Sequence, residues 1–340
     1  MIKEKISQEI DNIKGYKDLN ILATVGTTAR DSIDFVVLPR RKALNFYSIN
    51  FLVSDSKVAE QCFRFLDGKV KFILIDVEAK KKIDIENIAR TNIKKSIIIP
   101  YKPNDVTLEA ADLFLLNHFN LSIKHKNILI YGAGNLGTKL ALRLAERGAN
   151  IYMYSRNHNK VKQISDTLNL ILPKYSTNKI KSISNTEDFS DYFDAIVSFI
   201  AADKVINKNI IFSLKKEALV LDGGINNYTP EFYFHSHQKL LKCFRLDVRL
   251  SFYYSLCPLL NDVKDFFTDI QGIGFIEEVR IVSGGIIGDS GDVVVDKINS
   301  PQQIIGIANG IGGLKDLDSY THFDKYKIQK LQKKLPLNKE

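Results

Sequence analysis

Cysteine is scarce in this sequence, tryptophan is absent, and there is no long apolar run. The three cysteines, Cys62, Cys243 and Cys257, form no CxxC pair, which argues against a disulfide framework or a metal site and favours a reducing cytoplasm. No uncharged apolar run approaches the ~20 residues that span a bilayer, and the charged N-terminus is typical of an amphipathic helix rather than a signal peptide. We therefore expect a cytoplasmic protein that binds neither a metal nor a membrane.

The positive charge of the chain is not accompanied by a nucleic-acid-binding motif. The formal net charge is +9, spread along the sequence, with the densest run of lysines at 325–339. Aromatic and basic residues do not interleave as they do in single-strand binders, and neither a helix-turn-helix nor an RNP-like motif is present. We expect no nucleic-acid partner; the charge favours attraction of small anions such as cofactor phosphates.

The 340 residues are enough for two α/β domains. Early in the chain, short β-rich runs alternate with a helical run, which favours βαβ units; we expect strands at 19–25, 49–54, 70–77 and 96–100 and a helix at 56–66. A bridging helix is expected at 107–119, with Asn104 or Asp105 as its N-cap. Beyond it we expect, late in the chain, a helical stretch at 259–267 and glycine-rich β-like runs at 279–295 and 304–313. We predict an α/β fold with an N-terminal substrate domain at 1–105, a Rossmann dinucleotide-binding domain at 106–250, and a β-containing C-terminal extension at 251–340 that packs partly on the others.

A glycine motif in the middle of the chain has the context that dinucleotide binding requires. Gly132, Gly134 and Gly137 follow a buried apolar strand at 127–131, and a helix and a second strand follow them at 138–147 and 151–154. In such a motif the glycines permit a tight turn, close approach of the pyrophosphate and close helix packing, with the helix N-terminus facing the phosphates. We predict dinucleotide binding by these glycines and by Asn135 and Leu136; the alternative is a structural βαβ turn.

The residues after the second strand favour NADP over NAD. An NAD enzyme usually has an acidic residue at this place, but this chain has Ser155, Arg156 and Asn157. A carboxylate would repel a 2′-phosphate, whereas a guanidinium binds one in bidentate fashion. We predict that these three residues bind the cofactor; the alternative is that Arg156 is a solvated surface residue.

Two later strands, at 193–202 and 218–222, end where a ligand is expected. Ligands in parallel sheets bind beyond the carboxyl ends of the strands. Ser198, Asp222 and Asn226 are therefore cleft candidates, and we assign Ser198 and Asn226 to the cofactor; alternatively, Ser198 faces a neighbouring helix.

Several short segments follow one another in an order found in a known family. They are Val25-Gly26, Ser32, 35–36 and 40–43, then 72–76 with 82–84, then 220–226, 246–248 and 282–288. In this order they resemble the methylenetetrahydrofolate dehydrogenase/cyclohydrolase family, and the two-domain layout is similar, more broadly, to that of shikimate dehydrogenases. The resemblance implies an NADP-dependent enzyme that acts on a one-carbon folate or a related pterin.

The resemblance also points to catalytic candidates, although the motif is altered. The family's catalytic helix carries Tyr-x-x-x-Lys; here Phe35 stands at the tyrosine position, and the lysine position falls near Arg40, with Lys42 the nearest amine. Asp76 stands where the family has a glutamine. We therefore take Lys42, Asp76 and Arg40 as catalytic candidates and do not expect cyclohydrolase activity. Because Pro39 interrupts the helical pattern, a strand is the alternative for 34–38.

Taken together, these features predict an NADP-dependent dehydrogenase with a small-molecule substrate. The resemblance implies that this substrate is a folate or pterin. A second copy of the chain, in a homodimer, is a candidate partner. Two alternatives stay open. One is a shikimate-like ketone or alcohol dehydrogenase in which Lys42 and Asp76 form a proton-transfer pair. The other is a cofactor-binding protein without catalysis. A pterin-sized apolar slot would favour the first reading, a small polar pocket holding that pair the second, and the absence of an open cleft the third.

Overall fold

The computed structural model describes residues 2–13, 15–16, 19–28 and 34–335, and the chain forms two compact units, Met1–Ser255 and Leu256–Glu340. Ser32, part of the family resemblance, lies outside the described residues. The predicted α/β fold class is confirmed: the described part of the chain forms a mixed sheet, a parallel Rossmann-type sheet and, in the second unit, a small mixed sheet. Within this part, no helix is both long enough and apolar enough to cross a bilayer.

The first lobe of the first unit is built around the mixed sheet, whose strand order is β2-β3-β1-β4-β5. Its elements are α1 (Ile2–Ile13), β1 (Asn20–Gly26), β2 (Phe35–Ala43), β3 (Phe46–Val53), α2 (Ser56–Leu66), β4 (Phe72–Asp76), α3 (Ile85–Asn92) and β5 (Ile97–Tyr101). Apolar residues of α1, α2 and α3 pack with those of the strands into one core. Strands β1, β3, β4 and β5 pair in parallel, so their carboxyl ends lie along one edge of the sheet.

The segment that resembles a catalytic helix is instead the edge strand β2, antiparallel to β3. Pro39 cannot donate a ladder hydrogen bond, which confines it to edge strands and bulges, and the pairing of β2 with β3 shifts register between Leu38 and Arg41. The helical interpretation of this segment is therefore wrong, and the strand alternative for 34–38 is correct.

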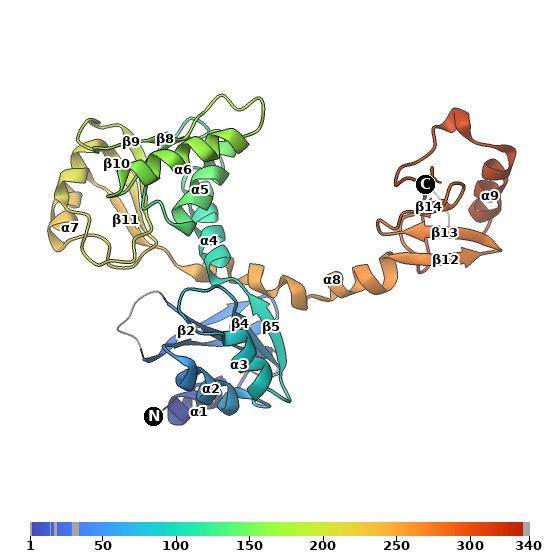
Figure 1. Ribbon diagram of the computed structural model, residues 1–340, viewed down its shortest axis with the longest axis horizontal. Coiled ribbons are helices and arrows are strands. Elements are labelled where there is room, and N and C mark those ends of the chain that lie inside the picture. The colour runs from blue at the N-terminus through green and yellow to red at the C-terminus, as the bar shows by residue number, and fades with distance from the viewer. Residues whose placement is uncertain (1, 14, 17–18, 29–33, 336–340) are drawn as a thin grey trace. The chain divides into compact units, whose positions relative to one another are not determined.

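Helix α4 (Pro103–His118) connects the two lobes (Figure 1). It begins four residues earlier than predicted, with Lys102 at the N-cap position and Pro103 in the first turn. Because proline is pre-organised for the first helical position, it starts the helix, and Asn104 and Asp105 lie inside it rather than capping it. The chain later returns to α4 through a 3₁₀ segment, Val248–Leu259, where the Ser251 hydroxyl donates a 2.6 Å hydrogen bond to the Val106 carbonyl.

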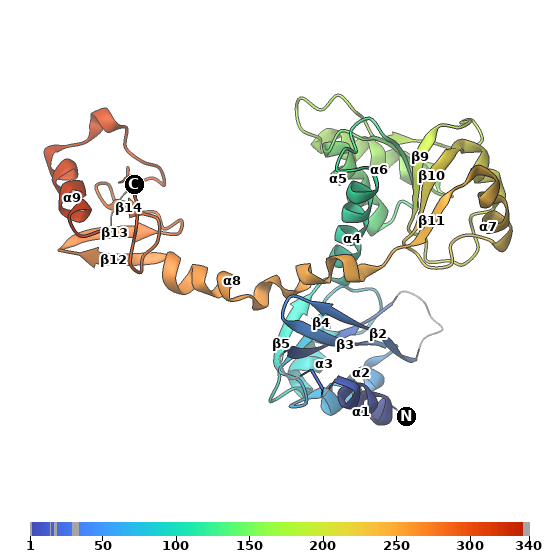
Figure 2. The ribbon, with the colours of Figure 1, turned by 180° about the vertical axis from the view of Figure 1, so that it is seen from behind.

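The second lobe of the first unit is a Rossmann-type domain. Its elements are β6 (Asn127–Tyr131), α5 (Asn135–Glu146), β7 (Asn150–Tyr154), α6 (His158–Ile171), β8 (Lys181–Ser182), β9 (Phe193–Ser198), β10 (Leu214–Asp222), α7 (Pro230–Ser236) and β11 (Lys242–Arg245). The sheet order is β8-β7-β6-β9-β10-β11 with every pairing parallel, which is the dinucleotide-binding order 3-2-1-4-5-6. Figure 2 shows α5, α6 and α7 around this sheet.

The second unit contains α8 (Asn261–Asp265) with a π-helical turn after it, the strands β12 (Gly272–Ile276), β13 (Val279–Ser283), β14 (Val293–Val295) and β15 (Ile304–Ile307), and α9 (His322–Gln332). The strands form a sheet in chain order. Leu331 of α9 packs into its core beside Ile281 and Ile307.

Candidate active-site cleft

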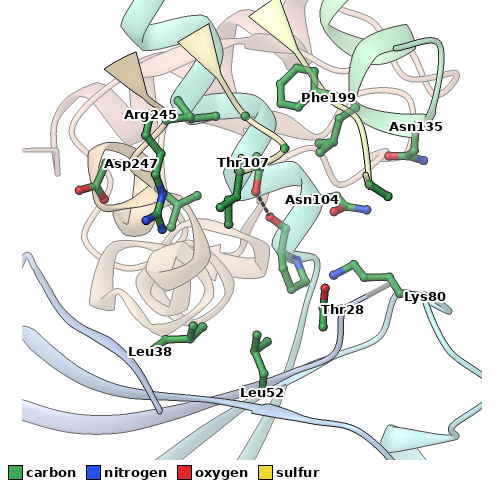
Figure 3. A pocket seen from close by; sticks show the side chains of 18 of the residues that line it. Thr28, Leu38, Leu52, Lys80, Asn104, Thr107, Asn135, Phe199, Arg245 and Asp247 are labelled. Carbon is green, nitrogen blue, oxygen red and sulfur yellow. Dashed lines mark hydrogen bonds between the residues drawn. The ribbon is translucent and has the colours of Figure 1, made fainter. Parts of the chain in front are cut away.

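A cavity of about 850 Å³ lies within the first unit and is lined by residues of both lobes. The second lobe contributes the glycine loop and the carboxyl ends of β9, β10 and β11, and the first lobe contributes strand residues and the loop after β4. In Figure 3, Leu38 and Leu52 lie on the first-lobe side, Phe199 and Asn135 lie on the Rossmann side, and the Lys80 side chain lies beside Asn104. The glycine loop of the Rossmann lobe and the loop after β4 of the first lobe therefore line one and the same cavity.

The glycine loop has the geometry that its motif predicts. Gly132 has φ +119°, which disfavours a side chain, and its N–H donates to the Tyr154 carbonyl at 2.8 Å. A Cβ on Gly137 would overlap the carbonyl oxygen of Gly132, so the third glycine is required for α5 to pack against the loop. These two glycines therefore fix the shape of the turn.

Gly134 faces open space. It is the N-cap of α5 and provides no side-chain cap, and a Cβ added to it would meet no atom within 4 Å. Gly134, Asn135 and Leu136 all line the cleft. A helix N-terminus that has amide groups without a side-chain cap and adjoins a cavity fits the pyrophosphate of a dinucleotide.

The residues predicted to select NADP lie at the carboxyl end of β7. The Arg156 side chain is exposed, and its charge acts on Tyr131 at the end of β6. Asn157 is the N-cap of α6, where its side-chain oxygen accepts a 3.0 Å hydrogen bond from the Lys160 amide. Ser155, which precedes them in the chain, is half-buried. Asn157 thus caps a helix, whereas the Arg156 side chain is exposed to solvent.

Ser198 and Asn226 are not placed as predicted. Ser198 is fully buried, its hydroxyl lies 3.4 Å from the carboxylate of Asp222, and it is not among the residues that line the cleft. The Asp222 carboxylate accepts hydrogen bonds from the amides of Gly224, Ile225 and Asn227. It thereby shapes the turn after β10, where Gly223–Ile225 line the cleft and Asn226 does not.

A buried ion pair stands at the first-lobe side of the cleft. Asp76 ends β4 with its side chain fully buried, and it accepts hydrogen bonds from the backbone amide and hydroxyl of Thr27 at 3.0 and 3.1 Å. Lys80 Nζ lies 2.9 Å from Asp76 Oδ2 and 3.0 Å from Glu78 Oε2. Lys80 and Thr27 line the cavity. Asp76 does not line it, but its carboxylate binds both residues.

The other two catalytic candidates point elsewhere. Lys42 is exposed on β2, three strand spacings or about 14 Å across the sheet from β4, so the predicted Lys42–Asp76 pair does not form. Arg40 donates two hydrogen bonds to Glu9 of α1, at 2.7 and 3.1 Å. Because the segment is an edge strand and not a helix, it places Lys42 and Arg40 outside the residues that line the cleft.

Arg41, which the sequence interpretation passed over, lines the cleft instead. Its guanidinium lies over the Phe252 ring, 5.4 Å from the centroid. Burial lowers the pKa of Arg41, and the neighbouring Tyr101 phenol and Asp247 carboxylate only partly offset this effect. Arg41 follows the register shift in β2 and lines the cleft, whereas the Arg40 side chain bonds to Glu9 of α1; the sequence alone does not show this register shift.

Comparisons with known proteins agree with the Rossmann lobe. Residues 127–248 match the family model of the NAD binding domain of 6-phosphogluconate dehydrogenase, so this lobe is an NAD(P)-binding domain of the dehydrogenase type. None of the curated proteins matches this chain.

The chain also shows a distant likeness to solved two-domain structures. A shikimate dehydrogenase in complex with NADP⁺ is 16% identical over 70% of this chain and 89% of its own, with a TM-score of 0.45. The dipicolinate synthase A chain from Bacillus subtilis is 14% identical over 74% of this chain and 96% of its own, with a TM-score of 0.39. The methylenetetrahydrofolate dehydrogenase/cyclohydrolase from Campylobacter jejuni is 14% identical over 78% of this chain and 95% of its own, with a TM-score of 0.37. At these values the likeness does not indicate what this chain acts on.

Proposed function

We propose that this protein is an NADP-dependent dehydrogenase that transfers hydride to or from a small polar substrate held between the two lobes. The observation that carries the proposal is one cavity lined both by the open glycine loop at Gly134 and by the amine of Lys80. The cofactor would supply the hydride, and the protein must supply position and a proton.

The preference for NADP rests on Arg156. It stands exposed after the second strand of the Rossmann order, where the 2′-position of the adenosine ribose is expected. In the short segment 155–157 there is no carboxylate to repel a phosphate. A bidentate guanidinium–phosphate contact there would favour NADP.

Lys80 is the group best placed to move the proton. When a carbonyl is reduced, its carbon gains the hydride and its oxygen gains a proton; in the reverse reaction the hydroxyl gives that proton up. The Lys80 ammonium lies at the cavity wall and has a buried carboxylate behind it, so it can donate the proton and be held in position by Asp76. This is the proton-transfer pair of the shikimate-like alternative, with Lys80 in place of Lys42.

The position of β2 weighs against a folate-type reaction. The segment that resembles the Tyr-x-x-x-Lys helix is a strand, and its Lys42 does not line the cleft. The chain therefore lacks a counterpart of the family's catalytic helix at this place. We therefore propose a small carbonyl or alcohol substrate, and a one-carbon folate is the second candidate because of the matched segment order. The open cleft argues against a protein without catalysis.

The experiment is a two-step screen of the full chain. Thermal shift first compares NADP, NAD, tetrahydrofolate derivatives, 2-oxo acids and hydroxy acids; NADPH oxidation or NADP⁺ reduction is then followed at 340 nm with the compounds that bind. The proposal expects stabilisation by NADP and turnover with a carbonyl or hydroxyl compound. Turnover with methylenetetrahydrofolate alone would support the folate candidate, and no cofactor binding would overturn both.

A further inference from the structure

We infer that Arg41 binds an anionic group of the substrate and that this group is a carboxylate. The inference rests on the proposed function, because it identifies which part of that substrate the first lobe holds. Arg41 comes from β2 and lines both the main cleft and a small adjoining cavity of about 90 Å³. Strand backbone holds its Cα, and Phe252 lies against its guanidinium, so the group is fixed in position before a ligand arrives.

In the part of the chain that the structure describes, the positive charge of Arg41 has no close carboxylate partner. Among the residues that the structure describes, none forms an ion pair with its guanidinium. Two other cations of the first lobe are paired: Arg40 with Glu9 at 2.7 Å, and Lys80 with Asp76 at 2.9 Å. A partly buried guanidinium without a counter-ion is costly unless an anion completes the site.

Neither nearby acid neutralises Arg41. Burial raises the pKa of Tyr101 to about 12, so its phenol is uncharged at neutral pH. Asp247 accepts two hydrogen bonds from the Arg249 guanidinium, including one of 2.8 Å from Nε, and these lower the pKa of Asp247. The negative charge of Asp247 is thus already engaged, and the charge that balances Arg41 is left for a ligand to bring.

The size and polarity of the small cavity define the ligand group. Tyr101, Thr24 and Thr107 line it together with Arg41 and several apolar side chains, so the cavity wall carries hydroxyl groups as well as the guanidinium. Its volume is below the ~150 Å³ that holds a benzene ring, which excludes a ring and leaves room for a compact anion. A single guanidinium balances one negative charge, which favours a carboxylate over a doubly charged phosphate.

The test uses matched probes on the full chain saturated with NADP. Binding of benzoate and benzamide, of pyruvate and pyruvamide, and of inorganic phosphate is measured by ligand-observed NMR titration. The variants are Arg41→Gln and Arg41→Lys, with Lys42→Gln as the control, because Lys42 is the next residue on the same strand, carries the same charge and is exposed away from the cavity. Circular dichroism checks that each variant folds.

The expected result is that the wild type binds at least one carboxylate more tightly than its amide by about 10- to 100-fold, the range of a charge-assisted hydrogen-bond pair. Arg41→Gln should lose that preference, Arg41→Lys should keep part of it, and Lys42→Gln should match the wild type. Equal binding of acid and amide, tighter binding of phosphate, no binding of either carboxylate, or equal losses in Arg41→Gln and Lys42→Gln would each overturn the inference. If NADP binds normally while carboxylates fail, only this inference falls. If NADP does not bind, the proposed function itself fails.

Discussion

Lys80 and Asp76 form a buried ion pair at the wall of the cleft, with Nζ 2.9 Å from Oδ2 and the Asp76 side chain fully excluded from solvent. Thr27 donates two further hydrogen bonds to the same carboxylate oxygen. The carboxylate therefore anchors a lysine and a threonine that both line the cavity. This arrangement connects the fold of the first lobe to its proposed proton transfer.

Replacing Lys80 by methionine should reduce kcat by about 10²-fold or more, because the substrate oxygen would lose its proton donor. The measurement is steady-state turnover of the substrate found in the screen, with NADP affinity determined in parallel. Lys42→Met is the matched control and should stay within a few-fold of the wild type, since Lys42 is exposed and outside the cavity. Activity of Lys80→Met close to that of the control would remove Lys80 from the mechanism.

Two glycines of the same loop should respond differently to a side chain. Gly134→Val should fold and lose NADP binding, because Gly134 faces open space at an ordinary φ of −92° and the new side chain would enter the pyrophosphate site. Gly137→Val should unfold or lose several kcal/mol of stability, because its Cβ would overlap the Gly132 carbonyl. Thermal unfolding and calorimetric titration with NADP separate the two outcomes. Normal NADP affinity in folded Gly134→Val would refute the assignment of this loop.

The second unit should carry an acid-sensitive contribution to stability at Asp324. Burial acts to raise the pKa of this carboxyl, but hydrogen bonds from Lys315 and Thr321 outweigh it and the net pKa is lowered. A lowered folded-state pKa stabilises the fold above the unfolded pKa near 4, and this contribution is lost as the pH falls through the folded-state value. Asp324→Asn should therefore destabilise the protein by about 1–3 kcal/mol at pH 7, and urea unfolding should show the difference shrinking below pH 4. A difference that is constant with pH would contradict this account.

The Rossmann lobe could be predicted from sequence because local signals and the fold agree there. The strand 127–131 has the predicted bounds, and the glycine loop begins its helix as the motif requires. The first lobe could not be predicted as well because its decisive features are not local. Pro39 hides the strand pattern of β2, and that strand forms because it pairs with β3. Lys80 lies in a charged run after a strand, and its spacing in the sequence does not mark it as the partner of Asp76. The burial of Ser198 could not be predicted for a related reason. The residues that bury a strand end come from distant parts of the sequence.

The proposed preference of the Rossmann lobe for NADP over NAD through Arg156 is tested most directly by calorimetric titration of both cofactors. The prediction is that the wild type binds NADP about ten- to a hundredfold more tightly than NAD, since a charge-assisted phosphate contact contributes roughly 1.5–3 kcal/mol. Arg156→Ala should bring the two affinities together by weakening NADP alone. Equal affinities for NADP and NAD in the wild type, or an Arg156→Ala variant that keeps the preference, would contradict the account.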